Sequence, residues 1–78
     1  MQALFVQIKC DLGKSYEVAG AIADKEIASE IYSTAGQWDL LVKFYIEDGI
    51  DIGHFVNEQV HSVPGIRDTL TIMTFRAF

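Results

Sequence analysis

Apolar and polar residues alternate along four stretches of the chain and recur at helical spacing along two others. A period of two is typical of β-strands, whose successive side chains point to opposite faces, whereas spacings of three and four residues indicate an amphipathic helix. The two patterns predict strands over residues 3–10, 26–34, 38–46 and 67–75, and helices over residues 15–25 and 51–62.

The order of these elements is β-α-β-β-α-β, which is the ferredoxin-like split βαβ arrangement. We therefore predict one α+β domain over residues 1–78, with two helices covering one face of a four-stranded antiparallel sheet. The strand positions expected to face the helices are apolar: Val6, Ile8, Leu40, Val42, Ile46 and Ile72.

The other face of the predicted sheet has no helix to cover it. This face carries more apolar side chains than a surface exposed to water usually does, and more polar side chains than the core of a monomer. We expect it to pack against a second copy, sheet to sheet, about a two-fold axis. The alternation assigns these residues to it: Phe5, Gln7, Tyr32, Thr34, Leu41, Lys43, Tyr45, Thr71, Met73 and Phe75.

Size and composition narrow the possible classes. A chain of 78 residues forms one domain with a thin core, and its apolar share of 50% favours association. The net charge of −5 argues against direct nucleic-acid binding, which needs clustered basic residues. The single cysteine, the lack of a membrane-spanning run and the lack of a signal peptide favour the cytoplasm, with no membrane partner.

The predicted hairpin at the middle of the chain, residues 33–39, is the most distinctive segment. Gly36 permits the chain reversal because it takes positive φ without steric cost. Trp38 and Asp39 follow it directly. Backbone N–H groups, an aromatic plane and a carboxylate together suit a small zwitterion, but an ordinary hairpin tip with a solvated Asp fits the same residues.

Other candidate groups have simpler explanations. The spacing of His54, Glu58 and His61 places them on one helix face, as a metal site requires, but this face is expected to point to solvent. Cys10 is read as a small core residue. No set of residues suits catalysis, and no metal or cofactor is expected. Threonines on the last strand reflect β-propensity or supply polar groups to a ligand.

Two stretches carry a family resemblance. Residues 33–43 resemble the Gly-x-aromatic-Asp hairpin of the Lrp/AsnC family of amino-acid-responsive regulators. Residues 63–71 resemble that family's Pro-Gly-Val segment and the Thr-x-Thr strand after it. The resemblance covers nearly the whole chain, but only the family's C-terminal effector domain, often called the RAM domain. Trp38 stands where the family usually has Tyr or Phe.

The resemblance implies an oligomeric sensor. Dimers formed through the sheets assemble further, often to octamers, and a free amino acid binds between dimers. In this reading Asp39 meets the ammonium group of the ligand, N–H groups around Gly36 meet its carboxylate, and the last strand of a neighbouring subunit lines the pocket. The implied ligand-binding residues are Gly36, Gln37, Trp38, Asp39, Thr69, Thr71 and Ile72.

One feature of the family is missing from the sequence. The chain opens directly on its first predicted strand, without the family's N-terminal helix-turn-helix. We therefore expect a stand-alone effector module that modulates transcription indirectly, for example in hetero-oligomers with full-length Lrp/AsnC regulators.

Two alternatives remain open beside this non-enzymatic sensor. One is an oligomerisation module that has no ligand. The other is a small dimeric α+β barrel enzyme, which needs a polar or cofactor-lined cavity between helices and sheet. The apolar positions predicted to face the helices make the enzyme the weakest of the three.

Overall fold

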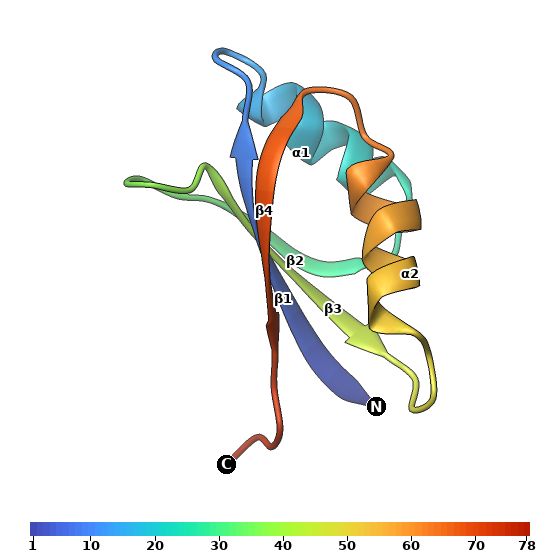
Figure 1. Cartoon of the computed structure of the whole chain (residues 1–78). Helices are drawn as coiled ribbons and strands as arrows, with labels where there is room; N and C mark the ends of the chain where they lie inside the picture. The colour runs from blue at the N-terminus through green and yellow to red at the C-terminus, as the bar shows by residue number, and fades with distance from the viewer.

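The computed structural model describes all 78 residues and shows an antiparallel sheet with helices packed on one side of it (Figure 1). This is the predicted ferredoxin-like α+β arrangement. The elements in chain order are β1 (Gln2–Cys10), α1 (Ser15–Asp24), β2 (Ala28–Ser33), β3 (Leu40–Ile46), α2 (Ile52–Val56), a π-helical turn η1 (Asn57–His61) and β4 (Ile66–Met73).

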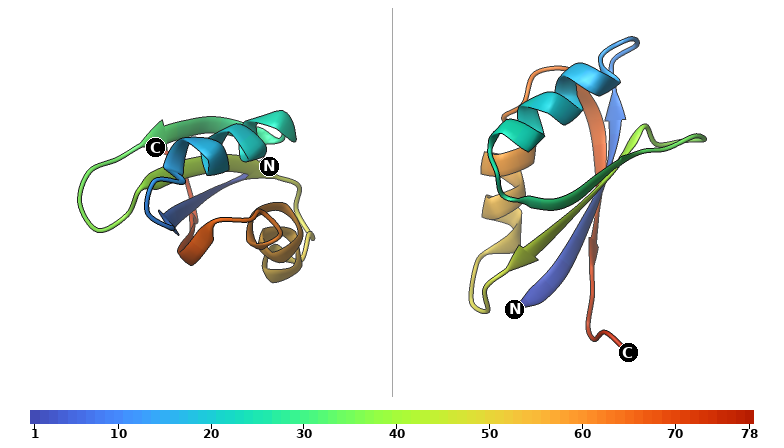
Figure 2. Two further views of the ribbon diagram at one scale, coloured as in Figure 1. Left: turned by 90° about the horizontal axis from the view of Figure 1, so that it is seen from above. Right: turned by 180° about the vertical axis from the view of Figure 1, so that it is seen from behind.

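The sheet has the strand order β2-β3-β1-β4, and every neighbouring pair is antiparallel. β1 and β3 are therefore central, and β2 and β4 form the edges. Figure 2 shows α1 and α2 on the same side of the sheet, while the connection between β2 and β3 projects away from the helices. One sheet face is thus covered within the chain, and the opposite face is open.

The core lies between the covered face and the helices, and it follows the period-two pattern of the central strands. Alternate residues of β1 and β3 point toward the helices and are at most 3% exposed. No polar or charged residue is buried. The thirteen buried residues are Leu4, Val6, Ile8, Cys10, Val18, Ile22, Leu40, Val42, Phe44, Ile46, Val56, Val60 and Val63.

The second helix begins where its sequence supplies a cap. The Asp51 carboxylate accepts a hydrogen bond from the His54 N–H at 3.1 Å, which satisfies a donor of the first turn. The predicted helix over 51–62 is present, but its second half widens into η1. Side-chain spacing does not reveal such a one-residue insertion. Neither helix has the length and apolarity needed to cross a bilayer.

The predicted faces of the last strand are wrong. In the register of β1 with β4, Ile72 lies opposite Phe5 and Thr71 lies opposite Val6. Ile72 therefore points to the open face, while Thr71 and Met73 point to the helix side. The reason is that β4 is an edge strand whose helix side is largely uncovered, so Met73 is 52% exposed there. Its alternation therefore carries little information about the core.

The structure also departs from the simple strand pattern in β2 and β3. A bulge between Ala28 and Glu30 interrupts the alternation of β2, so that Ala28 lies opposite Phe44 on the helix side and Glu30 lies opposite Lys43 on the open face. The third strand begins at Leu40, two residues later than predicted, which leaves Trp38 in the loop.

The core should respond strongly to truncation at a central-strand position. Leu40 is fully buried, so Leu40→Ala is expected to cost about 2–5 kcal/mol of unfolding free energy. Leu12 is 94% exposed, so the matched change Leu12→Ala should stay within about 0.5 kcal/mol. Urea unfolding followed by circular dichroism measures both. Equal effects at the two leucines would contradict the assigned core.

Candidate functional site: the β2–β3 hairpin and its flanks

The hairpin between β2 and β3 is closed by hydrogen bonds at its base. The Thr34 N–H donates to the Asp39 carbonyl oxygen at 2.9 Å, and the Thr34 hydroxyl donates to the Trp38 carbonyl oxygen at 2.8 Å. Gly36 at the tip has φ +98°, a conformation that a side chain disfavours. The loop therefore has a defined base and a tip of exposed backbone, as the role of Gly36 in the predicted turn requires.

Asp39 ties this hairpin to the central strand β1. Its Oδ2 accepts a hydrogen bond from the Cys10 N–H at 2.8 Å, and its own N–H donates to the Ile8 carbonyl oxygen at 2.9 Å. The pairing of β1 with β3 ends with Ile8 opposite Leu40. Beyond that point the Asp39 carboxylate accepts the hydrogen bond of the Cys10 N–H in place of a backbone carbonyl oxygen. Asp39 is consequently half-buried, and its interpretation as a freely solvated hairpin residue is wrong.

Cys10 lies at this junction as the small core residue predicted from the sequence. It is 3% exposed, and burial raises the pKa of its thiol. The charge of Asp39 acts in the same direction, whereas a hydrogen bond with Ser15 opposes it.

Two surface grooves flank the hairpin. The first, which we call the Trp38 groove, has a volume of about 410 Å³ and is lined by Lys9, Gln37, Trp38, Arg67 and Asp68. The second, the Asp39 groove, has a volume of about 380 Å³ and lies beside the start of α1. It is lined by Gly13, Ser15, Tyr16, Ser33, Thr34 and Asp39.

The grooves separate the hairpin residues expected to bind a ligand. Gln37 and Trp38 line one groove and Asp39 lines the other, while Gly36 lies at the tip between them. A ligand that contacts both Trp38 and Asp39 must therefore span the hairpin. Sequence reasoning placed these residues together because they are adjacent, and the direction of each side chain was not readable from that adjacency.

The residues expected on the last strand do not line either groove. Thr69 faces the helices, where its Oγ1 lies 2.7 Å from His61 Nε2. Thr71 shares that side of β4, whereas Ile72 is on the open face and 41% exposed. Within one chain the structure does not bring these three to the hairpin.

Sequence reasoning missed three residues of the Trp38 groove. Lys9 and Asp68 lie opposite each other across β1 and β4, and Arg67 is the extra residue of a bulge in that pairing. The pairing is between strands far apart in sequence. Two features of the sequence could have indicated these residues. Lys9 occupies a position of its strand that faces away from the core, and the charged residues Arg67 and Asp68 follow shortly after Pro64-Gly65.

The histidine cluster considered as a metal site does not converge. His54 Nε2 lies 2.9 Å from Glu58 Oε1, but His61 points elsewhere. Its Nδ1 lies 2.8 Å from Asn57 Oδ1, and its Nε2 contacts Thr69. The structure contains no group of three side chains placed to hold a metal ion.

The open sheet face carries a charged network among apolar residues. Lys43 Nζ lies 3.2 Å from Glu30 Oε2 and 4.8 Å from the centre of the Tyr45 ring. The Tyr32 hydroxyl donates to Glu30, and this bond, followed by Lys43, holds the pKa of that carboxyl below its ordinary value. The polar groups of Lys43, Glu30 and Tyr32 therefore have partners within the chain, whereas apolar side chains of the same face remain exposed.

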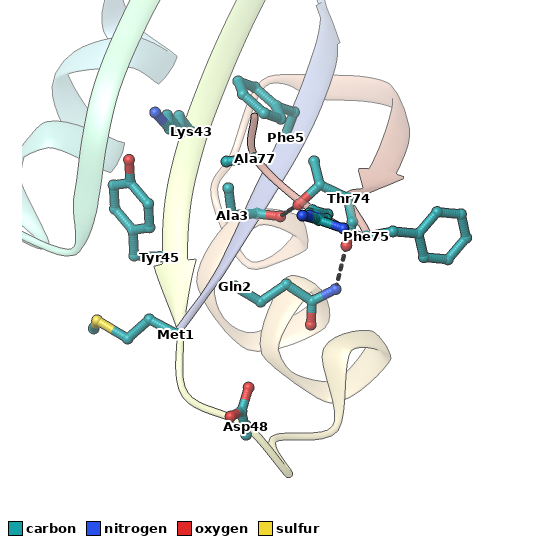
Figure 3. Close-up of a pocket in the computed structure, with 11 residues that line it drawn as sticks. Met1, Gln2, Ala3, Phe5, Lys43, Tyr45, Asp48, Thr74, Phe75 and Ala77 are labelled. Carbon is teal, nitrogen blue, oxygen red and sulfur yellow. Dashed lines mark hydrogen bonds between the residues drawn. The ribbon is translucent and has the colours of Figure 1, made fainter.

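A larger hollow lies at one end of the open face, where the residues after β4 lie beside the start of β1. It has a volume of about 580 Å³, and Phe5, Lys43 and Tyr45 line it beside the C-terminal residues (Figure 3). The Thr74 hydroxyl donates to the Ala3 carbonyl oxygen at 2.6 Å, and Gln2 donates to the Thr74 carbonyl oxygen.

The split βαβ sheet and its braced hairpin define a ferredoxin-like α+β domain. Residues 3–78 match the family model of the Lrp/AsnC ligand binding domain, and the chain therefore belongs to the Lrp/AsnC family. This is the family whose hairpin and Pro-Gly segments the sequence resembles.

Curated relatives are transcriptional regulators. HTH-type transcriptional regulator FL11 from Pyrococcus abyssi is 31% identical over 72 residues, which make up 92% of this chain and 47% of that protein. The chain thus spans about half the length of the curated relatives it matches.

Solved structures share the fold. TTHA0845 from Thermus thermophilus has a TM-score of 0.89 and 28% identity, with 100% of this chain and 98% of that chain covered. The structure of transcriptional regulator NMB0573 from Neisseria meningitidis in complex with L-Met has a TM-score of 0.80 and 17% identity, with 96% of this chain and 50% of that chain covered. At this identity the similarity shows a shared fold only.

The anchoring role of Asp39 gives a stability prediction. Asp39→Ala leaves the Cys10 N–H without its acceptor and is expected to lower the unfolding free energy by about 1–3 kcal/mol. Asp39→Asn keeps a carbonyl oxygen in place and should lose less. Urea unfolding of both variants measures the difference. If Asp39→Ala is as stable as the wild type, the carboxylate does not brace the hairpin.

Proposed function

We propose that this chain is an amino-acid-sensing effector module of the Lrp/AsnC type, which is not an enzyme and works within an oligomer. The observation that carries the proposal is the match of residues 3–78 to the family's ligand binding domain. The braced hairpin supports it, since a loop closed by hydrogen bonds at its base, with exposed backbone at its tip, offers preformed groups to a small ligand.

The chemistry of the hairpin suits a free amino acid. The residues around Gly36 are exposed, which makes their backbone N–H groups accessible to the α-carboxylate of the ligand. Asp39 uses Oδ2 to hold Cys10, which leaves Oδ1 for the ammonium group. Gln37 and Trp38 flank the other side of the loop. The NMB0573 complex with L-Met is an instance of an amino acid bound to a protein of this fold.

A neighbouring subunit completes the proposed pocket. The last-strand residues Thr69, Thr71 and Ile72 lie away from the hairpin of their own chain. In the proposal Thr69 and Thr71 contribute from the adjacent subunit, so ligand binding is linked to assembly, while Ile72, on the opposite face of β4, belongs to the dimer contact. The amino acid is the only small-molecule partner proposed, and no cofactor takes part.

The open sheet face is the proposed dimer contact. Tyr32, Tyr45, Leu70 and Ile72 are between 41% and 52% exposed on this face, although most are large and apolar. Exposed apolar area of this kind is characteristic of association surfaces. We propose a homodimer through the sheets, with dimers assembling into higher oligomers up to octamers.

The regulatory output is proposed to be indirect. With a net charge of −5, these 78 residues repel phosphate groups, and phosphate contacts dominate nucleic-acid affinity. Contact with full-length Lrp/AsnC regulators in the cytoplasm is the route we propose, since curated relatives are transcriptional regulators.

The open face also favours the second candidate, an oligomerisation module without a ligand. Association through this face needs no pocket, so the face by itself does not separate the two functions. The enzyme alternative has less support: the space between helices and sheet is filled by apolar side chains, with no buried polar residue to act on a substrate.

Amino-acid binding is tested by thermal unfolding in the presence of each common amino acid. A ligand at one hundred times its Kd should stabilise the fold by about 2.7 kcal/mol. For a domain of this size, that raises Tm by roughly 10–20 °C. Asp39→Asn should abolish the response, and the matched change Asp24→Asn on α1 should retain it. No shift with any amino acid at millimolar concentration would refute the sensor.

Dimerisation is tested by sedimentation of two variants at neighbouring positions. Ile72 faces the open side and Met73 faces the other side of β4, with similar exposure. Ile72→Asp should reduce the protein to its 8.7 kDa monomer, because it places a charge in the contact. Met73→Asp should leave the assembly unchanged. A wild-type protein that sediments as a monomer, or equal effects of both variants, would exclude this interface.

A further inference from the structure

The Trp38 groove contains two of the chain's six basic residues, Lys9 and Arg67, and neither makes an ion pair within 4.0 Å. Lys14 pairs with Glu17 and Lys43 pairs with Glu30. Lys25 donates a hydrogen bond to Ser62 Oγ, and Arg76 lies over the Phe78 ring. Lys9 and Arg67 have no such partner in a protein whose acidic residues outnumber its basic ones by eleven to six.

The backbone directs both cations to the same place. Lys9 lies on the open-face side of β1, half-buried beside the hairpin. The bulge at Arg67 breaks the alternation of β4 at its first residues. Arg67 lines the groove from β4, on the other side of β1 from the hairpin that contributes Trp38. Bulges commonly re-aim a side chain in this way.

The groove remains positive when its acid is counted. Asp68 is the one carboxylate among the lining residues, and its Oδ1 accepts a hydrogen bond from the Thr69 N–H at 2.9 Å. Two cations against one carboxylate leave a formal charge of +1. The Trp38 indole and the Gln37 amide supply an apolar wall and a hydrogen-bonding group beside it.

The geometry points to this groove as the selector of an acidic side chain, so that the ligand is L-aspartate or L-glutamate. This inference rests on the proposed function. If the α-ammonium and α-carboxylate groups are held at Asp39 and around Gly36 as proposed, the part of the ligand that enters the Trp38 groove on the other flank of the hairpin is its side chain. A carboxylate there meets Lys9 and Arg67, whereas an amide of the same shape brings no charge.

The experiment compares each acid with its own amide by isothermal titration calorimetry on the full chain. L-glutamate should bind about tenfold or more tightly than L-glutamine, and L-aspartate than L-asparagine, because hydrogen bonds to charged groups exceed neutral ones by that order. Lys9→Met and Arg67→Met should each reduce the preference, and the double variant should abolish it. Lys14→Met, which changes a lysine outside the groove, should retain it.

The outcomes separate the two proposals. If amides or apolar amino acids bind as tightly as the acids, the selector is refuted while the sensor stands. If no amino acid binds, both are refuted. If the acids are preferred and the double variant keeps that preference, the preference arises elsewhere and the assignment to Lys9 and Arg67 is wrong. Circular dichroism and urea unfolding establish that each variant is folded.

Discussion

The one-sided burial of the sheet is the constraint on which the rest of the structure depends. The helices cover a single face, and the thirteen residues buried there are all apolar. Within residues 1–78, no helix or strand lies over the other face. On that face Leu70 and Ile72 of β4 are more than 40% exposed, and β2 and β3 carry the Lys43–Glu30 pair. The strands of the sheet are hydrogen-bonded to one another within the chain, but the apolar side chains of its open face are not fully buried.

The hairpin is the second element that this sheet positions. Asp39 joins it to the end of β1, so the loop and the grooves on its flanks are fixed relative to the central strands. The Trp38 groove uses Lys9 of β1 and Arg67 of β4, which are strands that also carry the open face. In the proposed sensor, ligand binding and subunit contact therefore act on the same strands and are thermodynamically linked.

Sequence patterns predicted the features that depend on periodicity and turn residues. The element order, the burial of the central strands and the turn at Gly36 belong to this group. The patterns did not predict the faces of the edge strand β4 or the bulge that contributes Arg67, because both depend on pairing between distant segments. The structural role of Asp39 was missed for the same reason, since its partner Cys10 lies 29 residues away.

The central claim is that a second copy covers the open face, and hydroxyl-radical footprinting across a dilution series tests it most directly. Tyr32 and Tyr45 lie on that face and are 52% and 48% exposed in the single chain, while Tyr16 on α1 is 81% exposed. The account predicts that Tyr32 and Tyr45 are protected at high protein concentration and become reactive on dilution, with Tyr16 reactive throughout. Labelling of all three tyrosines that is independent of concentration would contradict it.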